Sequence, residues 1–270
     1  MASKPLIIAN WKMHKTIPEA VRFAMDLVKV LEGKIGADIV LGPPFTALRS
    51  VMEILKGSTI ALSAQNLHWE DKGAYTGEIS APLLVNTGCS YVILGHSERR
   101  QYFGETDEQI HKKLKAALTH GLIPVLCIGE TLQEREAGRT FTVLETQLEF
   151  ILLQIPKETA QKVVIAYEPV WATGTGKNAS PAQAGEVHHH IRQFLKERLA
   201  IKRAERIRIL YGGSVSPANT KALMMEPVID GLLVGNAGLE PESFIKIIQL
   251  ACEGHQARLL PGQGRLSEKE

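Results

Sequence analysis

The sequence contains few cysteines, and their spacing does not suggest pairing. Cys89, Cys127 and Cys252 are odd in number and far apart, and no two of them form a CxxC motif. This spacing argues against a zinc ribbon and against the disulfide framework of a small secreted domain. We therefore expect reduced thiols and a cytoplasmic location. Cys127 lies near the end of a predicted buried strand, so we expect it to serve in packing rather than as a nucleophile.

Long apolar runs and a strong excess of charge are also missing. No stretch approaches the roughly 20 apolar residues of a membrane helix. The short apolar run 6–9 is followed at once by polar Asn10 and Lys12, unlike a signal peptide. Lys and Arg number 31 against 29 Asp and Glu, which gives a formal net charge of only +2. We therefore expect no membrane association and no general nucleic-acid surface, although a local anion site is compatible with this balance.

Strand-like and helix-like segments alternate along the whole chain. The predicted strands are continuous apolar runs at residues 6–9, 39–41, 59–64, 91–94, 122–128, 163–167, 207–211 and 228–234. Such runs are typical of parallel strands that are covered on both faces. Between them lie segments with helical periodicity and N-terminal capping signals, for example Thr106 with Gln109 and Ser180 with Gln183.

Eight strand–helix units in about 250 residues favour a closed eight-stranded parallel (β/α)8 barrel over an open doubly wound sheet. We expect a single domain over residues 1–252, because no linker or shift in composition divides it. Residues 253–270 lack periodicity and contain Pro261, so we expect a loosely ordered tail. The mixed stretch 65–78 is predicted to be an extended loop.

In a parallel barrel the residues that follow the strands converge on one face. Those expected there are Asn10, Lys12, His96, Glu98, Glu168, Ser214, Gly235 and Asn236. Each is a weak signal alone, because a strand-end lysine or glutamate is more often solvated and a lone histidine is more often structural. Together they place a carboxylate, an imidazole, a fixed cation and exposed backbone amides at one mouth.

These groups suit proton transfer at a carbon beside a carbonyl. Glu168 can remove the proton, His96 can polarise the carbonyl, and Lys12 can stabilise the charge that builds on oxygen. His96 begins a short predicted helix, whose positive end favours a neutral imidazole. Short loops that run into helices after the last two strands present amides to a phosphate. Gly174 and Gly176 would let a loop beside Glu168 close over a ligand.

Eight stretches of the chain closely resemble the triosephosphate isomerase family, in family order and over about residues 5–251. They are residues 10–12, 64–66, 73–78, 93–100, 127–130, 166–171, 174–177 and 211–215. The resemblance implies interconversion of dihydroxyacetone phosphate and glyceraldehyde 3-phosphate through an enediol(ate), a step of glycolysis and gluconeogenesis. It implies no metal and no organic cofactor. It also implies that the family's fold, the (β/α)8 barrel, is present.

The resemblance also assigns roles to individual residues. Glu168 abstracts the proton, His96 acts as the electrophile, and Asn10 and Lys12 bind the substrate. Phosphate binding is assigned to the backbone amides of Gly174, Ser214, Gly235 and Asn236. Glu98 and Trp171 are expected as supporting residues.

The family forms homodimers, and the stretch 65–78 resembles the loop that reaches into the neighbouring subunit, with Thr76 near the partner's active site. Asn236 departs from the family pattern, which usually has a second glycine at this position. Its backbone amide remains, and asparagine tolerates unusual backbone conformations better than most residues do. We therefore expect phosphate binding to persist.

Two other classes of function stay open at this point. Another phosphosugar enzyme would need a second acid or base, as an epimerase does, or a buried Schiff-base lysine on a later strand, as an aldolase does. The sixth and seventh predicted strands contain no lysine. A non-catalytic barrel would have lost Glu168 or His96, and both are present. A metal site at residues 188–190 is not expected, because consecutive helical residues point in different directions, and the G-x-S-x-G motif of serine hydrolases is absent.

Overall fold

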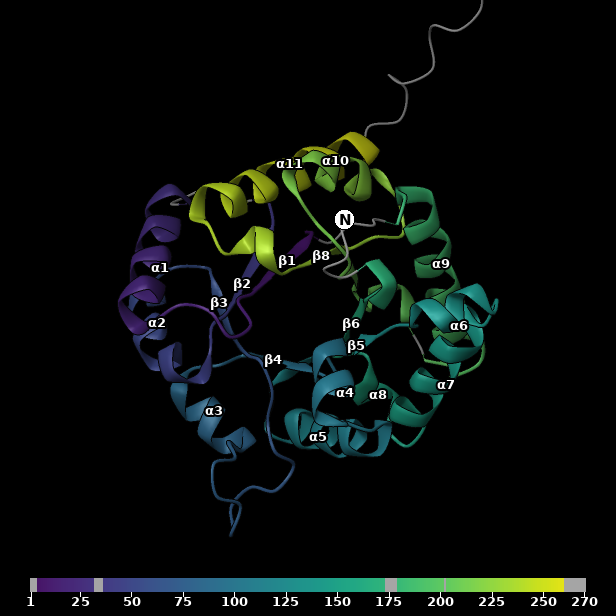
Figure 1. Cartoon of the computed structure of the whole chain (residues 1–270), viewed down its shortest axis with the longest axis horizontal. Helices are drawn as coiled ribbons and strands as arrows, with labels where there is room; N and C mark the ends of the chain where they lie inside the picture. The colour runs from purple at the N-terminus through teal and green to yellow at the C-terminus, as the bar shows by residue number, and fades with distance from the viewer. Residues whose placement is uncertain (1–3, 32–35, 173–178, 202, 260–270) are drawn as a thin grey trace, which may run out of the picture.

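A computed structural model of the chain describes residues 4–31, 36–172, 179–201 and 203–259. Its strands are β1 (Leu6–Asn10), β2 (Asp38–Gly42), β3 (Ala61–Ala64), β4 (Tyr91–Leu94), β5 (Ile123–Ile128), β6 (Val164–Tyr167), β7 (Ile209–Tyr211) and β8 (Gly231–Val234). Each strand pairs in parallel with the next, and β1 pairs with β8, which closes the sheet (Figure 1). The predicted eight-stranded parallel barrel is confirmed.

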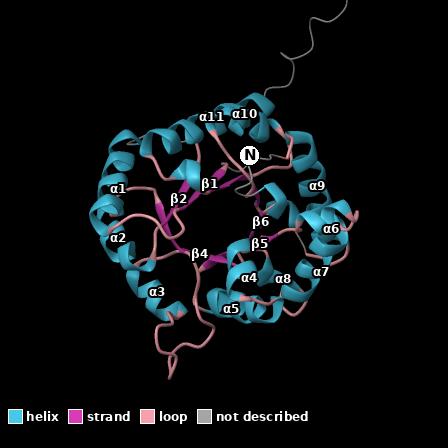
Figure 2. Ribbon diagram, viewed as in Figure 1, coloured by secondary structure: helices cyan, strands magenta, loops and turns pink. Residues whose placement is uncertain are grey.

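Helices form a ring outside the strands, as Figure 2 shows. They are α1 (Ile17–Leu31), α2 (Leu48–Leu55), α3 (Ala81–Thr87), α4 (Ser97–Phe103), α5 (Asp107–Thr119), α6 (Leu132–Glu136), α7 (Thr140–Leu152), α8 (Lys157–Ala160), α9 (Pro181–Glu197), α10 (Pro217–Met225) and α11 (Pro241–Leu259). Short 3-10 helices are η1 (Phe45–Ala47), η2 (Val170–Ala172), η3 (Ala204–Arg206) and η4 (Asn236–Gly238). Within the described ranges, no helix is both long enough and apolar enough to cross a bilayer.

The strands are buried on both faces, which explains their continuous apolar sequences. Leu6 and Ile8 of β1 belong to a cluster made almost wholly of strand residues, which fills the barrel interior. Ile7 and Ala9 of the same strand belong to a larger cluster with apolar residues of the surrounding helices. This division follows from the strand period of two, which sends successive side chains to opposite faces of a sheet.

Helix α3 is an element that the sequence analysis did not predict. It has only seven residues, too few to show a periodic apolar pattern. Its boundary signals are present all the same, since Pro82 lies in its first turn and Gly88 ends it with a φ of 95°. Gly138 separates α6 from α7 with a φ of 69°.

Helix α11 continues past residue 252 to Leu259, so residues 253–259, which were expected to be loosely ordered, are helical. A Cβ on Gly254 would lie 2.7 Å from the carbonyl oxygen of Lys221, so the glycine allows α11 to pack closely on α10. Arg258 Nη1 donates to the carbonyl oxygen of Ile229 at 2.7 Å and fastens the end of the helix. Residues 260–270 lie outside the described residues.

Candidate active site

The carboxyl ends of the strands surround a pocket of ≈ 100 Å³. Its lining comes from the ends of β1, β4, β6, β7 and β8 and consists of Asn10, Lys12, His96, Glu168, Gly212, Gly213, Ser214, Val215, Leu233, Gly235, Asn236 and Ala237. The pocket therefore brings together the side chains and backbone groups that the sequence placed at the mouth, except Glu98, which lies just behind them. Five strands far apart in the sequence contribute to one site because the sheet is closed.

The side chains of Glu168 and His96 are in direct contact. Glu168 Oε1 lies 3.0 Å from His96 Nε2, and Glu168 Oε2 accepts a hydrogen bond of 2.9 Å from the backbone N–H of Ser97. Glu168 is only 2% exposed. A carboxylate that is withdrawn from water is costly unless donors satisfy it, and these two donors supply that compensation here.

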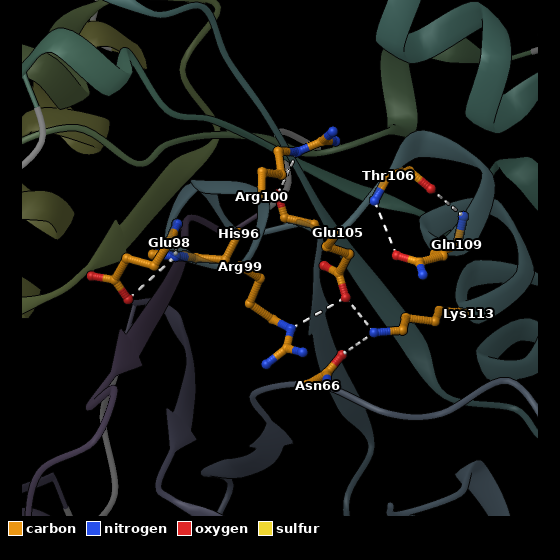
Figure 3. A network of polar contacts seen from close by, with 10 residues as sticks. Asn66, His96, Glu98, Arg99, Arg100, Glu105, Thr106, Gln109 and Lys113 are labelled. Carbon is orange, nitrogen blue, oxygen red and sulfur yellow. Dashed lines mark hydrogen bonds and ion pairs between the residues drawn. The ribbon is translucent and has the colours of Figure 1, made fainter. Parts of the chain in front are cut away.

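The contacts of His96 indicate which of its ring nitrogens donates into the pocket. Its Nδ1 accepts from the backbone N–H of Glu98 at 3.3 Å, where His96 caps α4. A nitrogen that accepts carries no hydrogen, so the ring hydrogen lies on Nε2 and points toward Glu168. Figure 3 shows Glu98 beside this ring, with a carboxylate oxygen 3.6 Å from Nδ1. The structure thus presents an Nε2–H group to the pocket.

Lys12 is held at the mouth by its backbone and by its side chain. Its φ is 53°, a left-handed conformation that is uncommon for a residue with a side chain. Asn10 Oδ1 accepts its backbone N–H at 3.1 Å, and Gln65 Nε2 donates to its carbonyl oxygen at 2.8 Å. Lys12 Nζ pairs with Glu98 Oε1 at 2.6 Å. The two backbone hydrogen bonds hold Lys12 in this strained conformation, and the ion pair with Glu98 keeps its ammonium group in a fixed position.

Two short turns complete the pocket lining, and the turn after β8 lies beside Lys12, since a Cβ on Gly235 would lie 3.4 Å from Lys12 Cε. After β7, Asn219 Nδ2 donates to the carbonyl oxygen of Ser214 at 2.9 Å, and Asn219 also completes a capping box with Ser216 at the start of α10. After β8, the turn at Gly235 and Asn236 enters η4. Both turns carry backbone amides at the start of helical segments, which is a favourable environment for an anion. Asn236 has no positive φ, so its side chain imposes no left-handed strain.

Glu130 joins the segments that precede and follow Glu168. It is fully buried, and its Oε1 accepts from Tyr167 Oη at 3.1 Å and from Trp171 Nε1 at 2.9 Å. Arg135 approaches the same oxygen at 3.2 Å. The predicted supporting residue Trp171 is thus anchored outside the pocket. Gly174 and Gly176, the proposed closing loop, lie outside the described residues.

Comparison with known proteins now decides the family. The triosephosphate isomerase family model matches residues 5–251. The chain belongs to the triosephosphate isomerase family. The triosephosphate isomerase of Endomicrobium trichonymphae is 53% identical over 246 residues, which cover 91% of this chain and 98% of that protein. The one from Aquifex aeolicus is 51% identical over 243 residues, which cover 90% and 98%.

Membership of the triosephosphate isomerase family confirms the family expected from the sequence motifs. The family interconverts dihydroxyacetone phosphate and glyceraldehyde 3-phosphate, and the chain is therefore an isomerase. The match spans all eight strands, so every segment that lines the pocket lies within it. The residue roles do not follow from family membership alone and depend on the geometry described above.

Several residues that organise this isomerase site were given no role from the sequence. Gln65 and Asn219 brace the turns through backbone carbonyls, and Glu130 Oε1 accepts from four side-chain donors. Each had a weak signal in the sequence. Gln65 directly follows a predicted strand, Asn219 occupies the third position after a Ser-Pro helix start, and Glu130 is an acidic residue beside a strand end.

Neighbouring histidines on α9 have different surroundings. His188 is fully buried, and its ring lies against Tyr167 and Tyr211, with ring centroids 6.0 and 6.5 Å away. His190 Nε2 instead contacts Glu145 at 2.9 Å. Among the described residues, no three histidine, cysteine or acidic side chains gather as metal ligands. Burial, and secondarily Arg192, lowers the pKa of His188 from 6.5 to about 3.

Replacement of His188 by glutamine should flatten the fall of stability in acid. Between pH 6.5 and about 3 the unfolded chain binds a proton at His188 that the folded chain does not bind, so stability falls as pH falls. Urea unfolding at about pH 7 and pH 5 should show a loss about 2 kcal/mol smaller in His188→Gln than in wild type. The exposed neighbour His189, changed to glutamine, is the control. An equal loss in both variants would contradict the assignment.

Proposed function

We propose that this isomerase transfers the proton with Glu168 as the base and His96 as the hydrogen-bond donor to the substrate carbonyl. The observation that supports this proposal is the 3.0 Å contact between Glu168 Oε1 and His96 Nε2 in one pocket with Lys12. A carboxylate, an N–H donor and a cation are the three groups that enolisation requires.

Glu168 must leave its present partners before it can act. Both of its carboxylate oxygens are engaged, one by His96 and one by the N–H of Ser97. A substrate carbonyl that takes the Nε2–H of His96 replaces Glu168 at that donor. The carboxylate can then turn toward the substrate carbon. Substrate binding and preparation of the base are thereby coupled through one hydrogen atom.

The proton and the electrons can then be followed through the reaction. Glu168 takes a proton from C1 of dihydroxyacetone phosphate, and the electron pair of the broken C–H bond forms a C=C bond. The negative charge moves to the oxygen on C2, where His96 and Lys12 stabilise it. The protonated Glu168 returns the proton to C2, while a proton moves between the two oxygens with His96 as the nearest donor. The product is glyceraldehyde 3-phosphate.

The phosphate group is proposed to bind at the turns after β7 and β8. Ser214, Gly235 and Asn236 line the pocket there and can offer backbone amides, and the amino end of α10 lies behind the first turn. Gly174 is proposed to contribute another amide. This would place the phosphate at the ends of β7 and β8, where Lys12 lies beside Gly235, and let the reacting carbons extend toward Glu168.

The chain is also proposed to form a cytoplasmic homodimer. The loop that carries Thr76 projects beyond the ring of helices between α3 and α5 (Figure 1). Thr76 itself is exposed and does not line the pocket of its own chain. Large apolar side chains are exposed in segments that follow other strands, among them Met13 after β1 at 94%, and Tyr102 at 69% and Phe103 at 70% in α4, after β4. Exposed apolar residues of this size favour a protein partner.

Glu168→Asp tests the base. Shortening the side chain by one methylene withdraws the carboxylate from the substrate carbon, and a misplacement of about 1 Å can cost about a hundredfold in rate. We expect kcat for glyceraldehyde 3-phosphate, measured in a coupled assay, to fall about a hundredfold with little change in KM. The same substitution at exposed Glu158 is the control and should have no effect. Equal turnover in wild type and Glu168→Asp would remove Glu168 as the base.

Asn236→Gly tests whether phosphate is held by the backbone. Because the amide is retained, we expect the inhibition constant of inorganic phosphate to change by less than about tenfold. Asn236→Asp keeps the backbone but adds a negative charge, so it should weaken inhibition more. A change above about a hundredfold, ~2.7 kcal/mol, in Asn236→Gly would show that the side chain dominates the site.

Thr76→Arg tests the dimer. A bulky charge at the tip of the projecting loop should prevent it from entering a partner, so sedimentation should shift from two chains to one chain of 29.7 kDa. Turnover should fall at the same time. Thr142→Arg, an equally exposed change on α7, should leave the mass unchanged. A wild-type protein that sediments as a single chain at micromolar concentration would overturn the proposal.

A further inference from the structure

Arg100 donates hydrogen bonds to the backbone directly before His96, although it does not line the pocket. It belongs to α4, the helix that His96 caps, and Figure 3 shows it close to this cap. Its Nε donates to the carbonyl oxygen of Gly95 at 2.8 Å, directly before His96. Its Nη2 donates to the carbonyl oxygen of Cys127 in β5 at 3.3 Å. One guanidinium group therefore joins the ends of β4 and β5.

The same connection continues to the base. In β5, Cys127 is followed by Ile128, whose carbonyl oxygen accepts the backbone N–H of Glu168 at 2.8 Å. A continuous path of hydrogen bonds and backbone thus runs from the residue before His96, through Arg100 and the end of β5, to Glu168 itself. The regular pairing of β4 with β5 ends at Leu94 and Leu126, so Arg100 takes over where the strand hydrogen bonds stop.

The guanidinium group is itself held in place. Its Nη1 donates to Asp107 Oδ1 at 2.6 Å, and Asp107 is the first residue of α5. The carbonyl of Gly95 depends on a left-handed backbone with a φ of 69°. A Cβ on Gly95 would lie 2.9 Å from the side chain of Ile110 and 3.2 Å from Arg100 Nη2. The turn before His96 is therefore shaped around the arginine.

We propose that Arg100 is a positioning residue that sets the spacing between His96 and Glu168 during proton transfer. The inference rests on the roles proposed for those two residues. A planar guanidinium group suits the task, because it offers three separate N–H directions to two carbonyl groups and one carboxylate. An ammonium group is a compact charge on a flexible stem and cannot hold all three partners in one plane.

The decisive measurement separates kcat from KM in Arg100→Lys and Arg100→Met. Neither phosphate turn touches Arg100, so KM and inhibition by inorganic phosphate should stay within about twofold of wild type. The spacing of the catalytic pair should be lost, and kcat should fall about tenfold to a hundredfold. Arg100→Lys should not restore the rate, although it preserves the charge.

The matched control is Arg208→Lys and Arg208→Met. Arg208 pairs with Asp38 at 2.6 Å and its side chain is 20% exposed, the same values as for Arg100 with Asp107. It precedes β7 and lies at the other end of the barrel from the pocket. We expect its variants to keep wild-type kcat even where they lower the melting temperature. A fall of kcat no larger in the Arg100 variants than in these controls would overturn the inference.

A milder variant covers the case in which the Arg100 variants do not fold. Asp107→Asn leaves the guanidinium group in place and only weakens its anchor, so kcat should fall about fivefold with unchanged KM. An unchanged kcat in a folded Asp107→Asn, together with Arg100 variants that do not fold, would reduce Arg100 to a structural role and overturn the inference.

Glu168→Asp, assayed in parallel, distinguishes the proposed catalytic roles of Glu168 and His96 from the proposed role of Arg100. If Glu168→Asp keeps full activity, the proposed catalytic roles fail; if it loses activity and the Arg100 variants do not, only the role of Arg100 fails.

Discussion

The pairing of β1 with β8 is the constraint on which the whole site depends. Leu6 lies opposite Gly231, and the two backbones approach so closely that a Cβ on this glycine would lie 1.9 Å from the carbonyl oxygen of Leu6. This pairing brings Lys12, near one end of the chain, beside Asn236, near the other. A cation suits the carbonyl oxygen of a triose phosphate and backbone amides suit its phosphate, and the closed sheet brings both kinds of group within a few ångströms of each other.

Closure gathers the groups, but buried polar contacts fix their orientation. Glu130 and Glu168 are both buried carboxylates, and each is stabilised by donors from segments distant in sequence. Such carboxylates are costly when one donor is removed, because an unsatisfied charge then remains in a dry environment. The same contacts that hold the mouth rigid are therefore those on which stability depends. Preorganised dipoles of this kind also save reorganisation during the reaction.

The sequence predicted the barrel and the mouth because both follow from local patterns. Apolar runs located the strands, and the order of the strands determined which polar residues share one face. Asn10, His96 and Glu168 could be placed in this way without coordinates. The orientation of Gln65 and Arg100 could not, since each acts on backbone carbonyl groups whose directions are set by tertiary packing. A sequence pattern shows which side chains share a face, but it does not show the directions of the backbone carbonyl groups to which Gln65 and Arg100 donate.

Strand β5 illustrates why such backbone contacts matter for the reaction. It lies between the strands that carry His96 and Glu168, yet in the described structure it contributes no side chain to the pocket lining. Its carbonyl groups connect to both neighbours, to Arg100 on one side and to the N–H of Glu168 on the other. Gly129 is the residue after this strand, and its backbone lies so close to that of Glu168 that a Cβ on Gly129 would be 1.8 Å from the carbonyl oxygen of Glu168. The strand therefore acts as a spacer, and the distance between His96 and Glu168 is determined by backbone geometry rather than by their two side chains alone.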